Sequence, residues 1–267
     1  MTGIGRRART LARAIAMAAC LAASAAAAQS PEANAYPSAL PAGPACATSV
    51  PLLSGARLPH AHQAVARRQA LTVVAVGSSS TVGLGAREAR NAYPARLEAE
   101  LRAAFPGVAV RVVNRGVNGE EAPAMLARFD RDVAAEKPDL VIWQVGSNGL
   151  LKGVPTADVL AALGQGLERT RALGADAVVM SPQYAPRILA AEGREGLLTR
   201  LAAAPAALFP RYEVMREWAD ARHIAFSQFL IEDGLHLNDW GYACTARLMA
   251  QALAGAIVAT PAQTAAR

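Results

Sequence analysis

The chain has 267 residues, of which 53% are hydrophobic and 18% charged, so it is long and apolar enough to bury a core of its own. Its formal net charge is +6, but residues 1–28 carry four arginines and no acidic residue, which leaves +2 for the remainder. The sequence has no basic run interleaved with aromatic residues, so the composition argues against a nucleic-acid partner.

Residues 1–28 have the pattern of an export signal. Four arginines come first, residues 14–28 form an apolar run of 15, and three alanines at its end provide a small-residue cleavage site. This run is shorter than the about 20 residues that a membrane-spanning helix needs, so we expect cleavage and no stable membrane insertion afterwards. Retention as an anchor and a lipid on Cys20 are the alternatives. The Arg6-Arg7 pair leaves open whether export follows the general or the twin-arginine route.

Residues 29–69 are predicted to form an extension or linker, because residues 29–51 are rich in alanine, proline and serine and show no apolar period. Cys46 lies in this extension and Cys244 near the end of the chain. An even pair of cysteines in an exported protein predicts a disulfide between them. Two buried free thiols are the alternative.

Apolar strand-like runs alternate with helical patterns between residues 70 and 258, followed by a tail at 259–267. The predicted strands are 71–76, 108–113, 139–145, 177–180 and, more weakly, 223–226. The predicted helices are 94–105, 122–135, 156–173 and 239–258, the last capped by Asn238. This alternation predicts one α/β domain in which a parallel sheet of about five strands lies between two layers of helices.

Polar segments follow four of these strands, at residues 78–81, 114–119, 146–148 and 233–236. Ligands of parallel sheets bind at the carboxyl ends of the strands. We therefore expect the four segments to meet at one edge of the sheet.

Ser79, Asp233 and His236 supply the groups of a nucleophilic catalyst. A serine hydroxyl is a weak nucleophile at neutral pH and needs an imidazole to take its proton, while a carboxylate fixes the tautomer of that imidazole. Taken singly, each residue has a structural explanation, such as a turn or a buried histidine. The combination favours catalysis.

The four segments resemble, in order, the conserved blocks of the SGNH (GDSL-type) hydrolases, a flavodoxin-like family of serine esterases. The resemblance covers roughly residues 71–253 and implies a flavodoxin-like three-layer sandwich. It makes Ser79, rather than Ser78 or Ser80, the nucleophile, with Asp233 and His236 completing the triad.

The same resemblance implies an oxyanion hole formed by the backbone N–H groups of Ser79 and Gly119 and the side-chain amide of Asn148. Such donors stabilise the negative charge that develops on the ester oxygen.

Two positions depart from the family pattern. Ser78 stands in place of the acid of the first block, and Gly149 in place of the acid that often follows the asparagine of the third.

The resemblance implies an exported serine esterase, secreted or periplasmic, that removes an O-acyl group from a small alcohol or a sugar through an acyl-enzyme. Carboxylesterase, lipase and deacetylase activities all fit this description. We expect no cofactor and no metal, since His60 and His62 lack a third ligand nearby. The alternatives are an acyltransferase to a sugar acceptor and a non-catalytic carbohydrate- or flavin-binding module. Residues 184–211 match no block and could form a lid or pocket wall.

Overall fold

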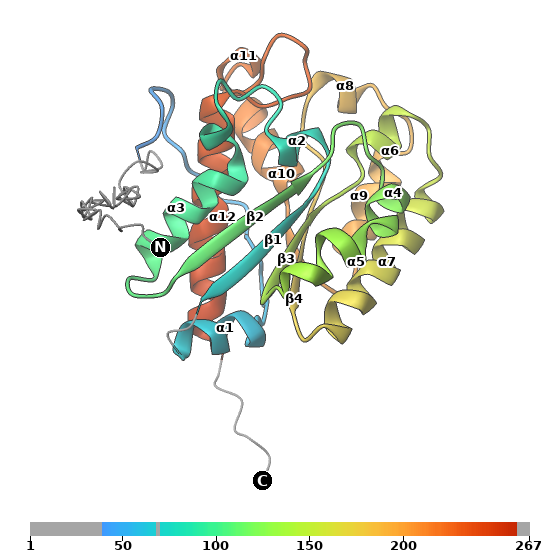
Figure 1. Ribbon diagram of the computed structural model, residues 1–267. Helices are drawn as coiled ribbons and strands as arrows, with labels where there is room; N and C mark the ends of the chain where they lie inside the picture. The colour runs from blue at the N-terminus through green and yellow to red at the C-terminus, as the bar shows by residue number, and fades with distance from the viewer. Residues whose placement is uncertain (1–38, 68–69, 261–267) are drawn as a thin grey trace, which may run out of the picture. The chain divides into compact units, whose positions relative to one another are not determined.

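The computed structural model describes residues 39–67 and 70–260 (Figure 1). The predicted export signal lies outside these residues. The fold is built on a five-stranded parallel sheet, which confirms the predicted parallel sheet of about five strands, and the order of the strands is β2-β1-β3-β4-β5. The strands are β1 (Leu71–Gly77), β2 (Val110–Gly116), β3 (Leu140–Gln144), β4 (Asp176–Met180) and β5 (Ala207–Phe209). This order is that of flavodoxin-like folds, which confirms the predicted fold class.

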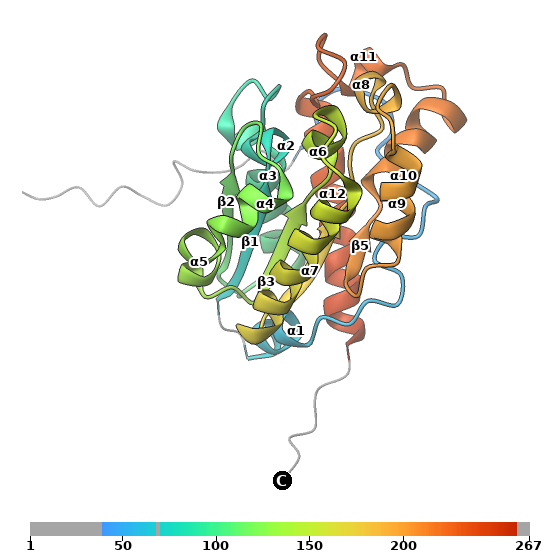
Figure 2. The ribbon, with the colours of Figure 1, turned by 90° about the vertical axis from the view of Figure 1, so that its right-hand side faces the viewer.

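Helices cover both faces of the sheet (Figures 1 and 2). One face carries α1 (Pro59–Ala66), α3 (Tyr93–Ala104), α10 (Arg211–Arg216) and α12 (Asp239–Ala259). The other carries α4 (Ala122–Ala127), α5 (Phe129–Asp132), α7 (Thr156–Ala172) and α9 (Arg194–Ala202). Short helices lie beyond the carboxyl ends of the strands, namely α2 (Ser79–Val82), α6 (Ser147–Leu151), α8 (Pro186–Leu189) and α11 (Phe226–Phe229).

Burial on both faces explains the continuous apolar run of β1. Val73 and Ala75 pack into the core beneath α3 and α12, whereas Val74 and Val76 pack into the core beneath α4 and α7. Successive side chains of a strand point to opposite faces, so a strand covered on both sides needs apolar residues at every position.

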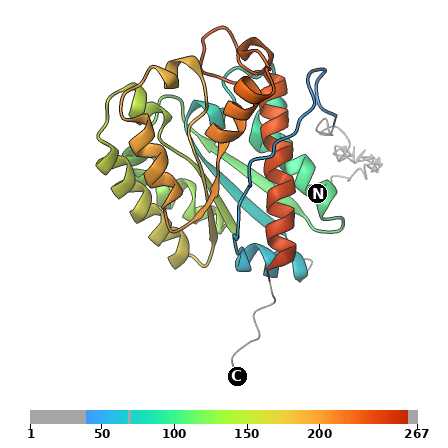
Figure 3. The same ribbon diagram turned by 180° about the vertical axis from the view of Figure 1, so that it is seen from behind.

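The closing helix, α12, is the one helix in residues 39–67 and 70–260 that is long and apolar enough to cross a membrane. More than half of its apolar window is buried, and it packs along α3 on one face of the sheet (Figure 3). The apolar character of α12 therefore reflects its place in the core. Asn238 caps this helix as predicted, accepting a hydrogen bond from Gly241 N at 3.0 Å.

The extension packs on the same side of the domain. The predicted disulfide is present, and it ties Cys46 to Cys244 of α12 with an S–S distance of 2.04 Å. Leu53 and Leu58 are buried in the core, and α1 follows them directly. Figure 3 shows this segment running across α12 before it reaches α1. Residues 39–67 thus form part of the packed domain.

The prediction of a fifth strand at 223–226 is wrong. His223 adopts a left-handed conformation with φ +56°, which ends any extended run, and Phe226 begins α11. The fifth strand is β5, three residues long, within the segment 184–211 that was predicted to be a lid or wall. That segment also contains α8 and α9, and α9 buries Leu197 and Leu201 in the core beneath α7.

The single helix predicted at 122–135 is also wrong. It is divided into α4, α5 and a short 3-10 turn (Ala134–Glu136). The backbone leaves helical geometry at Arg128, with φ −102° and ψ 9°, and α5 ends at Asp132. Arg128 is 7% exposed and turns its guanidinium toward the carboxyl edge of the sheet, where it makes the contacts described below.

Candidate active site

Ser79 lies where β1 ends, as the first residue of α2. Its side chain is almost buried, with 8% of the residue exposed. The preceding residue, Ser78, is held by Gln144 at the end of β3, whose Oε1 accepts from Ser78 N at 2.8 Å and from Ser78 Oγ at 3.0 Å. Ser78 stands at the position of the family's usual acid. Its N–H and its hydroxyl both donate to Gln144, and these two hydrogen bonds fix the turn before Ser79.

His236 connects Ser79 with Asp233. His236 Nε2 lies 2.8 Å from Ser79 Oγ, and His236 Nδ1 lies 2.5 Å from Asp233 Oδ2. A carboxylate only accepts, so Nδ1 carries the proton and Nε2 is left to accept from the serine hydroxyl. The structure therefore brings together the three side chains that the sequence predicted as a triad, although Ser79 is 157 residues away from His236.

Hydrogen bonds within the loop that carries Asp233 and His236 fix its conformation. Asp233 Oδ1 accepts from Leu235 N and His236 N, both at 2.9 Å, and Ile231 N donates to His236 O. Burial by itself would raise the pKa of Asp233, but the hydrogen bonds from His236 and Leu235 outweigh it and hold the pKa below its usual value. Asp233 is thus kept ionised beside the imidazole.

Gly119 and Asn148 lie in neighbouring loops. Gly119 has φ +74°, a conformation that favours glycine, in the turn between β2 and α4. Asn148 Nδ2 donates to Glu120 O at 2.9 Å, and Lys152 Nζ donates to Gly119 O at 2.8 Å. A primary amide has two N–H groups, so one of those of Asn148 holds the loop and the second can serve a ligand.

The Gly119 loop is also joined to the end of β1, where the Ser79 turn begins. Val117 N donates to Gly77 O at 3.0 Å. The guanidinium of Arg128 donates to Arg115 O at 2.9 Å, and it pairs with Glu120 at 2.7 Å. These contacts hold the turn that contains Gly119 against the ends of β1 and β2.

The sequence reasoning missed a buried polar frame beneath these loops. Gln183 Oε1 accepts from Ser147 Oγ at 2.7 Å and from Arg211 Nη2 at 2.8 Å, and Gln183 Nε2 donates to Leu235 O at 3.2 Å. Arg211 is fully buried, which lowers its pKa to about 10. One amide thus joins the residue before Asn148 to the residue before His236. The signal in the sequence that could have revealed Gln183 is its place just after the buried strand β4, at the edge of the sheet where the site is expected.

Gly149, the second departure from the family pattern, lies buried in α6. A Cβ at this position would lie 3.0 Å from Val159 Cγ2 of α7, so the packing of these two helices favours glycine here. The two N-terminal histidines do not join the site. His62 Nδ1 contacts Ile257 O at 2.8 Å, and no group of three possible metal ligands occurs among the described residues.

A model of the Non-GDSL lipase-like family matches residues 45–259. The chain belongs to this family. The match covers all four polar segments and confirms the resemblance to SGNH hydrolases that they suggested. The term Non-GDSL in the name of this family agrees with the first block of this chain, in which Ser78 stands at the position of the usual acid.

Two curated relatives are esterases. Esterase TesA of Pseudomonas aeruginosa is 33% identical over 129 residues, which are 47% of this chain and 63% of that protein. An acetylxylan esterase of Geobacillus stearothermophilus is 36% identical over 72 residues, which are 27% of this chain and 30% of that protein. The matches therefore span less than two thirds of either relative.

Solved structures share the fold at lower identity. A two-domain esterase active on acetylated mannans superposes with a TM-score of 0.65 and 17% identity, over 81% of this chain and 57% of that one. A catalytic variant of an acetylxylan esterase from Geobacillus stearothermophilus gives a TM-score of 0.57 and 20% identity, over 73% of this chain and 97% of that one. These similarities confirm the fold.

Proposed function

We propose that the protein is an exported serine esterase that removes an O-acyl group from an alcohol or a sugar through an acyl-enzyme. The observation that carries this proposal is the position of His236, within hydrogen-bond distance of both Ser79 and Asp233. Membership of a lipase-like family and similarity to two esterases support it.

In the proposed first step, His236 Nε2 takes the proton of Ser79 as Oγ attacks the ester carbonyl. The negative charge that forms on the carbonyl oxygen is stabilised by the N–H groups of Ser79 and Gly119 and the amide of Asn148. His236 then gives its proton to the leaving alcohol, and Ser79 keeps the acyl group. Asp233 stabilises the imidazolium throughout.

In the second step, a water molecule gives a proton to His236 and attacks the acyl-enzyme. The same donors stabilise the second oxyanion, and the proton returns to Ser79 Oγ as the carboxylic acid leaves.

The proposal also includes export of the protein and a carbohydrate ester as its substrate. The Cys46–Cys244 disulfide fits an oxidising compartment, as the sequence of residues 1–28 suggests. The names of one curated relative and one solved structure refer to acetylated xylan and mannan, which favours an acetylated carbohydrate as the substrate class.

Labelling with an active-site serine phosphonate, read by intact mass, tests the nucleophile. We expect one adduct on the wild-type protein and none on Ser79→Ala. Ser80→Ala is the matched control, because the Ser80 hydroxyl is buried and has no hydrogen-bond partner among the described residues. This control should keep its adduct. Labelling of Ser79→Ala, or no labelling of the wild type, would refute the assignment.

A further inference from the structure

The three proposed oxyanion donors come from three separate segments of the chain. Ser79 begins α2, Gly119 lies in the turn between β2 and α4, and Asn148 lies in α6. Donors of this kind act only when all of them point at the same atom, and a misplacement of about 1 Å can lower the rate about 100-fold. The contacts that fix these segments to one another should therefore control the reaction rate.

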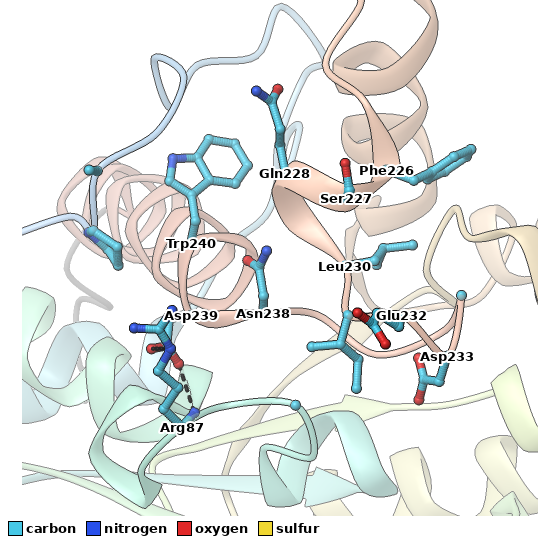
Figure 4. A pocket seen from close by; sticks show the side chains of 15 residues that line it. Arg87, Phe226, Ser227, Gln228, Leu230, Glu232, Asp233, Asn238, Asp239 and Trp240 are labelled. Atoms are coloured by element: carbon cyan, nitrogen blue, oxygen red, sulfur yellow. Dashed lines mark hydrogen bonds and ion pairs between the residues drawn. The ribbon is translucent and has the colours of Figure 1, made fainter.

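The cavity beside the catalytic loop does not supply these contacts. It has a volume of about 1010 Å³, and its walls come largely from residues 226–234 and the start of α12 (Figure 4). Asp233 lines it, but none of the three donor residues does. The alignment of the donors thus depends on contacts between the loops themselves.

Glu120 connects the turn of Gly119 with Asn148. It directly follows Gly119 in the chain, and its backbone O accepts from Asn148 Nδ2 at 2.9 Å. The amide group is planar, so holding one of its N–H groups also sets the direction of the second. The position of Glu120 therefore affects two of the three donors.

Arg128 connects Glu120 with the strand that leads to Ser79. Its Nε donates to Glu120 Oε2 at 2.7 Å, and its Nη2 lies 2.9 Å from Arg115 O and 3.4 Å from Gly77 O, near the ends of β2 and β1. A guanidinium is planar and presents its donors in a fixed fork, so one side chain holds these groups in a set geometry. Arg128 is 7% exposed, so the surrounding water weakens these contacts little.

A second ion pair on the same turn is exposed. Lys152 Nζ donates to Gly119 O at 2.8 Å and pairs with Glu121 at 2.7 Å, but 52% of the lysine side chain is exposed. Exposed ion pairs are screened by water and contribute little to a fixed geometry. The buried guanidinium of Arg128 is thus the stronger link between this turn and the sheet.

We propose that Arg128 and Glu120 are positioning residues, which together align Gly119 and Asn148 with Ser79. The inference rests on the proposed function. Neither residue has to touch a reacting atom, because both act through the donors of the oxyanion hole. Loss of either side chain should therefore lower the rate of the chemical steps and leave substrate binding unchanged.

Glu120→Ala tests the inference, because it removes the carboxylate that Arg128 holds and keeps the backbone O that Asn148 contacts. We expect kcat on an aryl acetate to fall about 10- to 100-fold, with KM changed less than about twofold, because the donors act on charge that develops in the transition state. The phosphonate should still label Ser79, more slowly. Glu120→Gln keeps an oxygen that can accept from Arg128 Nε, so it should restore kcat to within about threefold of the wild type.

Asp132→Ala is the matched control. Asp132 pairs with Nη1 of the same guanidinium at 2.8 Å, and its side chain is 14% exposed, compared with 18% for Glu120. It lies at the end of α5, and its removal keeps the groups that join Arg128 to Glu120 and to Arg115 O. We expect kcat to stay within about twofold of the wild type. Urea unfolding of both alanine variants separates a loss of stability from a loss of alignment.

A double-mutant cycle shows whether Glu120 acts through Asn148. Because Asn148→Ala removes a donor that Glu120 aligns, the combined variant should lose less kcat than the product of the two single losses, by at least about threefold. Four results would overturn the inference: a kcat of Glu120→Ala within about threefold of the wild type, an equal loss for Asp132→Ala, no recovery in Glu120→Gln, or single losses that multiply in full. Failure of the phosphonate to label Ser79 of the wild type would instead refute the proposed esterase, so the two failures are distinguishable.

Discussion

Replacing Gln183 with leucine should destabilise the fold and impair turnover together. Gln183 is 1% exposed, and its amide accepts from Ser147 and Arg211 and donates to Leu235 O. Leucine has a similar volume but no hydrogen-bonding atom, so Gln183→Leu leaves a hydroxyl, a guanidinium N–H and a carbonyl without these bonds in the interior.

The magnitude follows from these three groups. A buried polar group left without its partner costs about 1–3 kcal/mol, and a charged group costs more. Because neighbouring losses are not additive and the site can relax, we expect the free energy of unfolding to fall by about 3–5 kcal/mol. This is a large share of the 5–15 kcal/mol typical of a domain. Turnover should fall about 10- to 100-fold, since Ser147 precedes Asn148 and Leu235 precedes His236.

Urea unfolding followed by tryptophan fluorescence, together with kcat and KM on an aryl acetate, measures both effects. Gln183→Glu is the matched variant, because its two oxygens can still accept from Ser147 and Arg211 while only the bond to Leu235 is lost. We expect it to recover most of the stability, to within about 2 kcal/mol of the wild type. If Gln183→Leu unfolds within about 1 kcal/mol of the wild type, or if the glutamate variant is no better than leucine, Gln183 does not organise the site.

Three further predictions concern other parts of the molecule. Replacing Cys46 and Cys244 by alanine should lower the free energy of unfolding by up to about 5 kcal/mol, the chain-entropy value for a separation of 198 residues; a loss below about 1 kcal/mol in urea unfolding would contradict this. Burial raises the pKa of Asp176 to about 6, so the neutral form is favoured in the folded state, and the free energy of unfolding should fall by about 1–2 kcal/mol as the pH rises from about 4 to 6. Asp176→Asn should lose that part of the pH dependence, and an unchanged pH profile would exclude Asp176 as its source. Asn148→Ala should lower kcat about 10²–10³-fold while the phosphonate still labels Ser79, more slowly; a change in KM alone would argue against an oxyanion role.

The sequence by itself determined the elements whose signals are local. The run of β1 is apolar at nearly every position because both faces of that strand are buried. Consecutive residues therefore show the strand without any knowledge of its neighbours. The polar segments are also recognisable locally, because each directly follows a strand. In a parallel sheet the carboxyl ends of all strands lie at one edge, so segments that follow different strands lie near one another. Ser79, Asp233 and His236 could therefore be expected to meet before their distances were known.

The tertiary structure decided what depends on partners remote in the chain. The strand β5 has three residues, too few for a periodic signal, and it is a strand because it pairs with β4. Gln183 looks like any polar residue after a strand until Arg211 and Leu235 surround it. The extension lies on α12 because the Cys46–Cys244 disulfide and the hydrogen bond from Trp240 to Pro44 O join residues that are 198 and 196 positions apart in the chain. Contacts of this kind follow from packing in three dimensions, which no local pattern of residues encodes.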